Sequence, residues 1–188
     1  MDDGNIIAVG NFTSFHGQSA NYIVRINGTD GSVDQSFLAG SGADGAINRI
    51  TRNTTTGNIL LTGNFKKYNG QPVNGVVMIN ENGELNTSFT LAAIDGVPNF
   101  AGELSNGKII VSGSFNKYGS VVRVGMAILN PDGSLAPGYN NMGLFRGVVN
   151  NFVETTTSTG VPGVILYGDF DRFDNREVGN IVKFRMEN

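Results

Sequence analysis

The stretch Gly63–Asn80, GNFKKYNGQPVNGVVMIN, contains a Gly-x-Phe, a second aromatic residue three positions later, a polar turn and an apolar run. Related stretches begin at Gly10, Gly113 and Gly168, so the motif recurs at intervals of about 50 residues along the whole chain. Repeats of this length are typical of β-propellers and related arrays, in which each repeat is one supersecondary unit. The fold is therefore expected to consist of four copies of one unit.

Two short apolar runs flank the motif in every copy. NIIAVG, NILLTG, KIIVSG and GVILYG lead into the glycine, and YIVRIN, VVMIN, MAILN and IVKF follow the polar turn. In the first three copies the second run passes into Asp-Gly or Asn-Gly, which favours a tight hairpin turn because these residues tolerate positive φ. A third segment then ends in Phe37, Phe89 or Tyr139, and a fourth leads into the next repeat.

Four short strands per repeat and no helical periodicity predict an all-β fold, a β-propeller with four repeats and mostly four short antiparallel strands per blade. We expect one propeller domain or propeller fragment over residues 1–188. Its innermost strands are predicted at 46–53, 97–104 and 148–155. The repeats are placed at 1–45, 46–96, 97–147 and 148–188.

The sequence starts at a second strand and stops after a third, so it provides more second strands than innermost strands. We therefore expect an incomplete part of a larger propeller, whose open edge strands carry a risk of pairing with other chains. Self-association through those edges, or a closed ring with one thin blade, remains the alternative.

The aromatic residues of the motif are interpreted as structural. Each Phe and the aromatic residue after it are expected to fill the gap between neighbouring blades, where burying a ring contributes about 2 to 3 kcal/mol. The pairs are Phe12 and Phe15, Phe65 and Tyr68, Phe115 and Tyr118, and Phe170 and Phe173.

The order Gly-x-Phe, aromatic, Asn-Gly, apolar strand, Asp-Gly-Ser, Ser-Phe resembles the delta-60 repeat, a β-propeller repeat family of bacterial, often surface or exported, proteins. The clearest matches are Gly10–Phe37 and Gly63–Phe89. The third copy departs from the pattern at SLAPGY, where Ala136 and Gly138 stand, and the fourth ends before that segment. The resemblance implies a propeller fold and an exported or cell-surface location, and it provides no active site to transfer.

Composition excludes several function classes. The formal charge is −3, from 13 basic and 16 acidic residues, without a run of Lys or Arg that could follow a phosphate backbone, so nucleic acid is not expected as a partner. There is no cysteine, which rules out disulfides and thiolate chemistry. No apolar run approaches the roughly 18 residues of a membrane helix, so this segment is not expected to insert into a membrane.

Few residues suggest catalysis, and no catalytic residue or cofactor is predicted. The single histidine, His16, occupies a turn position held by Asn69 and Asp174 in other copies. Asp169, Asp171 and Asp174 form the densest acidic cluster and are considered as calcium ligands, because Ca²⁺ binds carboxylates on flexible loops. The other copies carry no equivalent ligand set, so a turn role is favoured over a metal site.

The polar loops between second and third strands are the better candidate for function, because loops on a rigid scaffold commonly carry binding sites. Exposed Tyr together with Asn and Gln would suit a carbohydrate or a peptide, provided that the rings are not buried. The ligand-binding candidates are His16, Gln18, Tyr68, Asn69, Gln71, Tyr118 and Asn175. We expect a non-catalytic binding or scaffolding module; the alternative is a catalytic propeller, a hydrolase or lyase with carboxylates or a metal near the ring axis.

Overall fold

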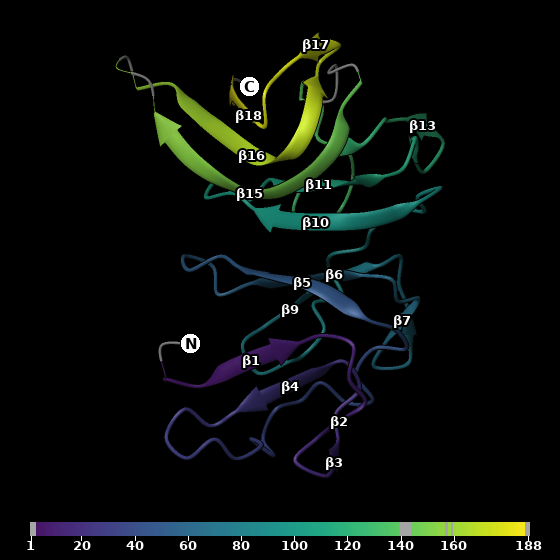
Figure 1. Cartoon of the computed structure of the whole chain (residues 1–188), viewed down its shortest axis with the longest axis vertical. Coiled ribbons are helices and arrows are strands. Elements are labelled where there is room, and N and C mark those ends of the chain that lie inside the picture. The colour runs from purple at the N-terminus through teal and green to yellow at the C-terminus, as the bar shows by residue number, and fades with distance from the viewer. Residues whose placement is uncertain (1–2, 140–143, 157, 159, 187–188) are drawn as a thin grey trace. The chain divides into compact units, whose positions relative to one another are not determined.

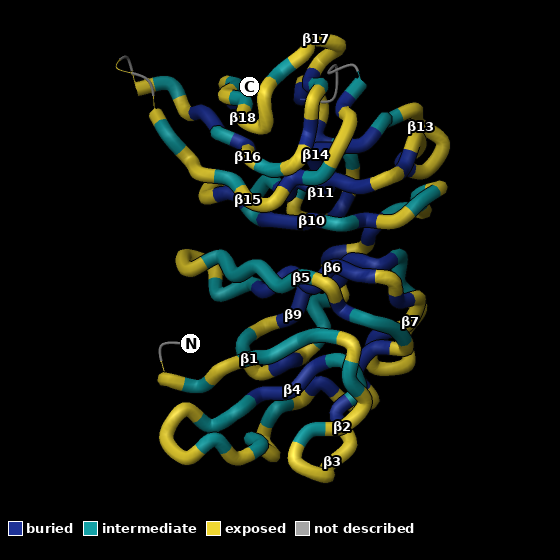
Figure 2. The backbone as a smooth tube through the Cα atoms, viewed as in Figure 1, coloured by how far each residue is buried: buried dark blue, intermediate teal, exposed yellow. Residues whose placement is uncertain are grey.

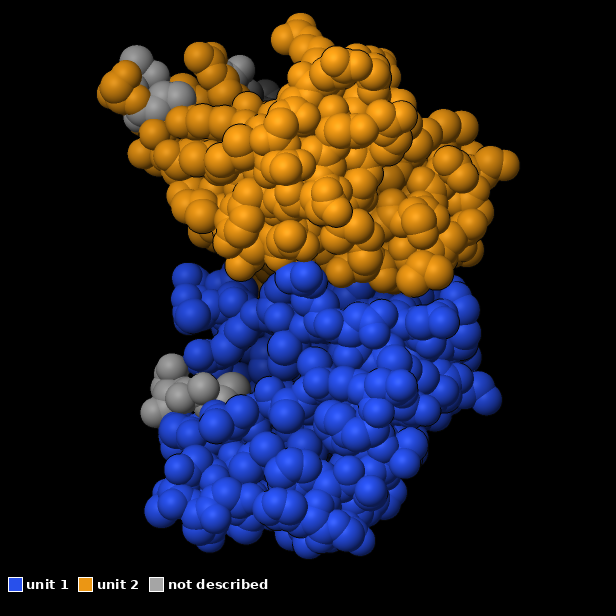
Figure 3. Space-filling view, viewed as in Figure 1, with its two compact units in different colours: residues 1–91 blue, residues 92–188 orange. Residues whose placement is uncertain are grey.

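The structure is a computed structural model that describes residues 3–139, 144–156, 158 and 160–186 (Figure 1). All regular secondary structure in this part of the chain is β-strand, arranged in small antiparallel sheets. This confirms the predicted all-β class. The chain divides into two compact units, Met1–Leu91 and Ala92–Asn188, which Figure 3 shows in different colours.

Each repeat forms one main sheet, and we call these four sheets blades 1 to 4. Blade 1 pairs only a second strand with a third, whereas the other blades begin with an innermost strand. Blade 1 contains β1 (Ile6–Val9) and β4 (Ile23–Ile26); blade 2 contains β5 (Ile47–Arg52), β6 (Ile59–Gly63) and β9 (Val76–Ile79). Blade 3 contains β10 (Val97–Glu103), β11 (Ile109–Ser114) and β14 (Met126–Leu129); blade 4 contains β15 (Arg146–Thr156), β16 (Pro162–Phe173) and β18 (Ile181–Arg185).

The predicted outer strand is reduced to one bridge in each of the first three repeats. The bridges join Ile26 to Val33, Ile79 to Leu85 and Leu129 to Leu135. Beyond its bridge, each outer segment leaves the third strand and runs on to its terminal aromatic residue.

A short hairpin connects the second and third strands of each repeat. The first three are β2 (Ser14–Phe15) with β3 (Gln18–Ser19), β7 (Lys67–Tyr68) with β8 (Gln71–Pro72), and β12 (Lys117–Tyr118) with β13 (Val121–Val122). In blade 4 the end of β16 itself pairs with β17 (Arg176–Glu177). These hairpins correspond to the polar loops singled out in the sequence.

Each unit has its own hydrophobic core between its two blades, visible as the buried segments in Figure 2. In unit 1, Phe65 and Tyr68 of blade 2 lie in one cluster with Ile23 of blade 1. In unit 2, Phe170 and Phe173 of blade 4 join residues of blade 3 such as Phe100. The motif aromatics of repeats 2 and 4 therefore fill the space between blades, as the sequence predicts, and Phe115 and Tyr118 of repeat 3 are buried as well. Phe12 and Phe15 of repeat 1 are only half-buried, so the prediction does not hold for them.

The glycine of Gly-x-Phe is required where an innermost strand passes beside it. A Cβ atom on Gly63 would lie 2.2 Å from the Ala46 carbonyl oxygen, and one on Gly113 would lie 2.2 Å from that of Val97. Likewise, a Cβ atom on Gly168 would lie 2.1 Å from the Val148 carbonyl oxygen. Because backbone oxygens at such distances cannot move aside cheaply, only glycine fits in these three blades.

Gly113→Ala is predicted to destabilise the fold by about 1–3 kcal/mol, since the new methyl group must push two paired strands apart. The matched control is Gly10→Ala in blade 1, where the added Cβ would meet only the edge of the Phe12 ring, at 3.2 Å. Urea unfolding followed by circular dichroism measures both. Equal losses for the two variants would contradict the assignment.

Candidate functional site

The tips of the hairpins are tight turns with left-handed backbone. His16, Asn69 and Asp174 have φ values of 47°, 46° and 49°, and the next residue, Gly17, Gly70 or Asn175, also has positive φ. Two successive positive φ values are the signature of a type I′ turn, which matches the twist of the flanking strands. The predicted turn role of His16 is thus confirmed, and its exposed ring stacks on Phe15 with centroids 4.3 Å apart.

Aspartate side chains hold two of the hairpins in place. Asp44 Oδ1 accepts hydrogen bonds from the backbone N–H groups of Lys66 (2.7 Å) and Lys67 (2.8 Å). In the next repeat Asp95 Oδ1 accepts from Asn116 and Lys117 at 2.7 and 2.8 Å. The same carboxylate therefore anchors the same pair of amides in blades 2 and 3.

In blade 4 the hairpin is held by an ion pair, with a basic residue at the position of the aspartate and an acidic residue on the hairpin. Arg146 occupies the position of Asp44 and Asp95, and its Nε donates to Asp171 Oδ1 at 2.8 Å. The Arg146 guanidinium holds the pKa of Asp171 below its usual range. The ion pair with Arg146 thus gives Asp171 a structural role at this hairpin.

Two of the predicted ligand-binding residues, Tyr68 and Tyr118, belong to the core. Their exposed fractions are 0% and 3%. The Tyr68 hydroxyl donates to the Gly83 carbonyl oxygen at 3.4 Å, and the Tyr118 hydroxyl donates to that of Gly133. Burial raises the pKa of both phenols. Both rings are buried under their hairpins, so neither presents an aromatic surface to a ligand.

Two further predicted residues bind backbone of the preceding loop. Asn69 Oδ1 accepts from Ser41 N–H at 3.3 Å, and Asn175 Oδ1 accepts from Leu144 N–H at 3.0 Å. Their left-handed turn positions and these contacts give them a structural role. Gln18 and Gln71, by contrast, are exposed, and each lies at the rim of a groove.

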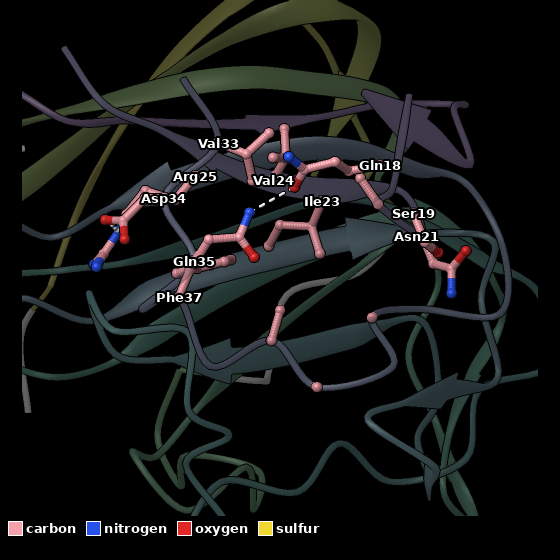
Figure 4. Close-up of a pocket in the computed structure, with 14 residues that line it drawn as sticks. Gln18, Ser19, Asn21, Ile23, Val24, Arg25, Val33, Asp34, Gln35 and Phe37 are labelled. Carbon is pink, nitrogen blue, oxygen red and sulfur yellow. Dashed lines mark hydrogen bonds and ion pairs between the residues drawn. The ribbon is translucent and has the colours of Figure 1, made fainter. Parts of the chain in front are cut away.

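The first groove, called groove 1, has a volume of about 220 Å³ and lies between the hairpin, β4 and the outer segment of repeat 1. Gln18 and Gln35 meet across it, with Gln35 Nε2 donating to Gln18 Oε1 at 2.5 Å (Figure 4). Ile23 and Val24 provide apolar lining between them. The remaining lining residues are Ser19, Ala20, Asn21, Arg25, Val33, Asp34, Phe37, Ala39, Gly40 and Gly42.

The charged residues of groove 1 neutralise each other. Arg25 is buried, and its Nε donates to Asp34 Oδ2 at 2.8 Å. Its other nitrogens donate to the Ser36 hydroxyl and the Glu81 carbonyl oxygen, and its guanidinium lies 5.3 Å from the centre of the Phe37 ring. The groups left for a ligand are therefore mainly uncharged amides.

Groove 2, of about 230 Å³, is the equivalent space in repeat 2. It lies between the β7–β8 hairpin, β9 and the outer segment, with Gln71 where groove 1 has Gln18. Asn21 and Asn74 correspond as well: their side-chain amides donate to the carbonyl oxygens of Ser41 and Leu91, both at 2.9 Å. The other lining residues are Pro72, Val73, Val76, Val77, Leu85, Thr87, Phe89, Thr90 and Leu91.

Repeat 3 retains the framework and replaces the polar lining. Val121 stands at the position of Gln18 and Gln71, Val124 at that of Asn21 and Asn74, and Pro137 at that of Gln35. The polar groove is therefore a feature of repeats 1 and 2, both in unit 1. The sequence did not single out Asn21, Asn74 or Gln35, although aligning the first two copies would have exposed their correspondence.

Within residues 3–139, 144–156, 158 and 160–186, no three His, Cys, Asp or Glu side chains come together as a metal-ligand set. Asp171 is bound by Arg146, and Asp174 lies in a left-handed turn. The structure thus gives the calcium alternative at Asp169, Asp171 and Asp174 no common site.

The aspartates of the Asp-x-Ser turns also have local roles. The pKa values of Asp30, Asp34 and Asp132 are lowered because the serine two residues later donates both its hydroxyl and its backbone N–H. A general acid needs the opposite shift, so these groups are suited to fixing turns and not to proton transfer.

Comparison with protein families matches three segments, residues 2–37, 55–89 and 104–138, to the model described as a domain of unknown function (DUF5122) β-propeller. Each segment runs from a second strand through the hairpin and the third strand to the outer segment. The chain belongs to the DUF5122 β-propeller family. This confirms the resemblance to delta-60 repeats and the propeller repeat architecture.

Searches of curated proteins and of solved structures gave no match to this chain. None of the described residues forms a helix long and apolar enough to cross a membrane.

Asp95→Asn is predicted to lower the melting temperature at pH 7 and to flatten its dependence on pH in acid. Hydrogen bonds from the Asn116 and Lys117 amides lower the pKa of Asp95 in the folded state. The carboxylate therefore stabilises the fold above the unfolded pKa of about 4, and this stability is lost as pH falls through the folded pKa.

Thermal unfolding between pH 7 and pH 2 measures the effect. Lys117→Ala is the control, because it keeps the backbone amide and should retain the acid dependence. A variant Asp95→Asn with the wild-type pH profile would contradict the anchoring role.

Proposed function

We propose that this domain is a non-catalytic binding module of an exported or cell-surface protein, and that grooves 1 and 2 hold a neutral, hydroxyl-rich ligand such as a carbohydrate. The observation that carries the proposal is the recurrence of one groove in two repeats, with Gln18 and Gln71 at the same place in each. The fold does not require glutamine at these exposed positions, so its presence in both repeats favours a common binding function for the two grooves.

The size of the grooves limits the ligand. Drug-sized molecules occupy pockets of roughly 300–1,000 Å³. Grooves 1 and 2 have volumes of about 220 and 230 Å³, so each fits one sugar ring or one or two side chains of a peptide. A polymer that places successive units in the two grooves would gain affinity through linkage of two weak sites.

The lining chemistry favours hydroxyl groups over charged groups. Amide side chains donate and accept hydrogen bonds at once, which matches a hydroxyl group. The Asp34 carboxylate is committed to Arg25, so neither charge is free to select an ion. Ile23 and Val24 line groove 1, and Val76 and Val77 line groove 2, but all four side chains are buried, so the ligand would be held mainly by hydrogen bonds.

The catalytic alternative receives less support. An enzyme acting by acid–base chemistry holds at least one group with a pKa shifted toward its task in a cleft. The shifted aspartates here are held more firmly in their ionised form by hydrogen bonds from serine, backbone amides or Arg146. Neither groove presents a carboxylate without a partner.

The double variant Gln18→Ala, Gln71→Ala is predicted to weaken carbohydrate binding about tenfold or more while leaving the fold intact, since both side chains are exposed. The probes are neutral hexasaccharides of glucose and N-acetylglucosamine, titrated into the ¹⁵N-labelled chain and followed by amide chemical shifts. Shift changes are expected at residues 18–24 and 71–77.

Val121→Ala is the matched control, because it changes the same hairpin position in the repeat that lacks the polar lining. Shift changes confined to other surfaces, or binding unaffected by the double variant, would refute the proposed site. Cell fractionation of the full-length protein tests the proposed location independently.

A further inference from the structure

One wall of grooves 1 and 2 is the outer edge of a third strand. The outer segment is attached to this strand by a single bridge near its end, Ile26 to Val33 in repeat 1 and Ile79 to Leu85 in repeat 2. Groove 1 is lined by β4 and by outer-segment residues such as Gln35, and by none of the described residues of β1. The groove therefore lies against the edge of β4 that faces away from β1, and all of its walls belong to one repeat.

The backbone of β4 directs polar groups toward this edge. Alternate residues of an antiparallel strand turn their N–H and C=O groups to opposite sides. The Tyr22 C=O accepts from Gly10 N–H at 3.1 Å, so Tyr22 faces β1, whereas the Arg25 C=O accepts from Asp34 N–H of the outer segment at 2.9 Å. Ile23, which alternates with Tyr22, thus faces the outer edge. Its N–H and C=O have no hydrogen-bond partner among the described residues.

Repeat 2 has the same arrangement at Val76. The Gly75 C=O accepts from Gly63 N–H at 2.9 Å on the inner side, and the Met78 C=O accepts from the outer segment at 2.8 Å. Val76 lies between them and faces the outer edge, as Ile23 does. Ile23 and Val76 are only 3% and 2% exposed. Because a buried backbone group without a partner is costly, a hydrogen-bonding ligand in the groove is favoured.

The hairpin side of each groove offers a complementary group. Gln18 Oε1 accepts from Gln35 Nε2 at 2.5 Å, which leaves Gln18 Nε2 as a donor (Figure 4). Gln71 occupies the same place in groove 2. Val33 and Leu85 also correspond, and both are half-buried groove residues that offer some apolar surface. Each groove therefore combines a backbone edge, a side-chain amide and an apolar contact.

We propose that grooves 1 and 2 select carbohydrates that carry an acetamido group, such as N-acetylhexosamines, and that the strand edge binds this group. The inference rests on the proposed function of the grooves. A secondary amide is planar and trans, so its N–H and C=O point in opposite directions. In groove 1 its N–H would donate to the Ile23 C=O, its C=O would accept from Gln18 Nε2, and its methyl group would contact Val33. The equivalent residues would do the same in groove 2.

The short length of the open edge favours a sugar over an extended peptide. A peptide that adds to a sheet edge pairs through successive main-chain groups. Here the C=O groups of Arg25 and Met78 are already occupied by the outer segment, so only Ile23 or Val76 offers both of its groups. The groove volumes of about 220 and 230 Å³ likewise fit one sugar ring.

The test compares three ligands, each titrated into the full ¹⁵N-labelled chain and followed by amide chemical shifts. They are the β-1,4-linked hexasaccharides of N-acetylglucosamine and of glucose, and the glucose hexasaccharide acetylated at O2, which keeps the carbonyl and methyl groups and lacks the N–H. We expect the first to bind about tenfold more tightly than the other two, because each of these loses a hydrogen bond in both grooves. Shift changes are expected at residues 23–24 and 76–77, and not at Met126, the equivalent residue of repeat 3.

The double variant Gln18→Glu, Gln71→Glu removes the side-chain donors and keeps acceptor oxygens of the same size. It should abolish the preference for the acetamido ligand, whereas glucose hydroxyl groups can still donate to the carboxylates. Val121→Glu is the matched control, because it adds a negative charge at the same hairpin position of repeat 3 and should retain the preference.

The outcomes separate this inference from the proposed function. If the acetamido ligand binds no more tightly than either of the others, with shift changes still at Gln18 and Gln71, the acetamido selection is wrong and the carbohydrate grooves stand. If none of the three ligands binds in the grooves, both are wrong. Equally tight binding of acetyl-dialanine amide in the grooves would assign them to a peptide and overturn the inference.

Discussion

The approach of an innermost carbonyl oxygen to the glycine of Gly-x-Phe is the constraint on which the rest of blades 2 to 4 depends. At 2.1–2.2 Å from a Cβ position, the oxygens beside Gly63, Gly113 and Gly168 leave no room for any side chain. Two residues after these glycines, Phe65, Phe115 and Phe170 are buried. The glycine that admits the innermost strand and the ring that fills the core therefore stand at a fixed spacing in these three blades.

The same glycine also fixes where the third strand begins. Its N–H donates to the carbonyl oxygen of a residue with positive φ in all four repeats, Tyr22, Gly75, Gly125 and Asn180, at 2.9–3.1 Å. The hairpin between these two points is closed at its base by that bond and at its tip by the left-handed turn. It is a rigid support, and this explains how exposed amides such as Gln18 and Gln71 can hold a defined position.

Repeat phase, strand order, the turn role of His16 and the burial of the motif aromatics in repeats 2 to 4 could be predicted from the sequence, because each follows from periodicity and turn chemistry. The groove residues could not, since Asn21 and Asn74 are read as turn residues until their amides are seen to bind the next loop. The candidate tyrosines were misleading for a physical reason. Tyr68 and Tyr118 lie beside polar residues in sequence, yet the hairpin folds them beneath itself, where their hydroxyls find backbone carbonyl oxygens.

Blade 4 differs from blades 2 and 3 in how an acidic residue holds the hairpin. Where blades 2 and 3 use a carboxylate to bind two backbone amides, blade 4 uses Arg146 to bind the Asp171 carboxylate. Both solutions tie the start of the innermost strand to the hairpin, so the tie is required and its chemistry is not. An acidic cluster in such a repeat is therefore explained first by the position that it holds, and only groups beyond that requirement, like the exposed amides of Gln18 and Gln71, point to a ligand.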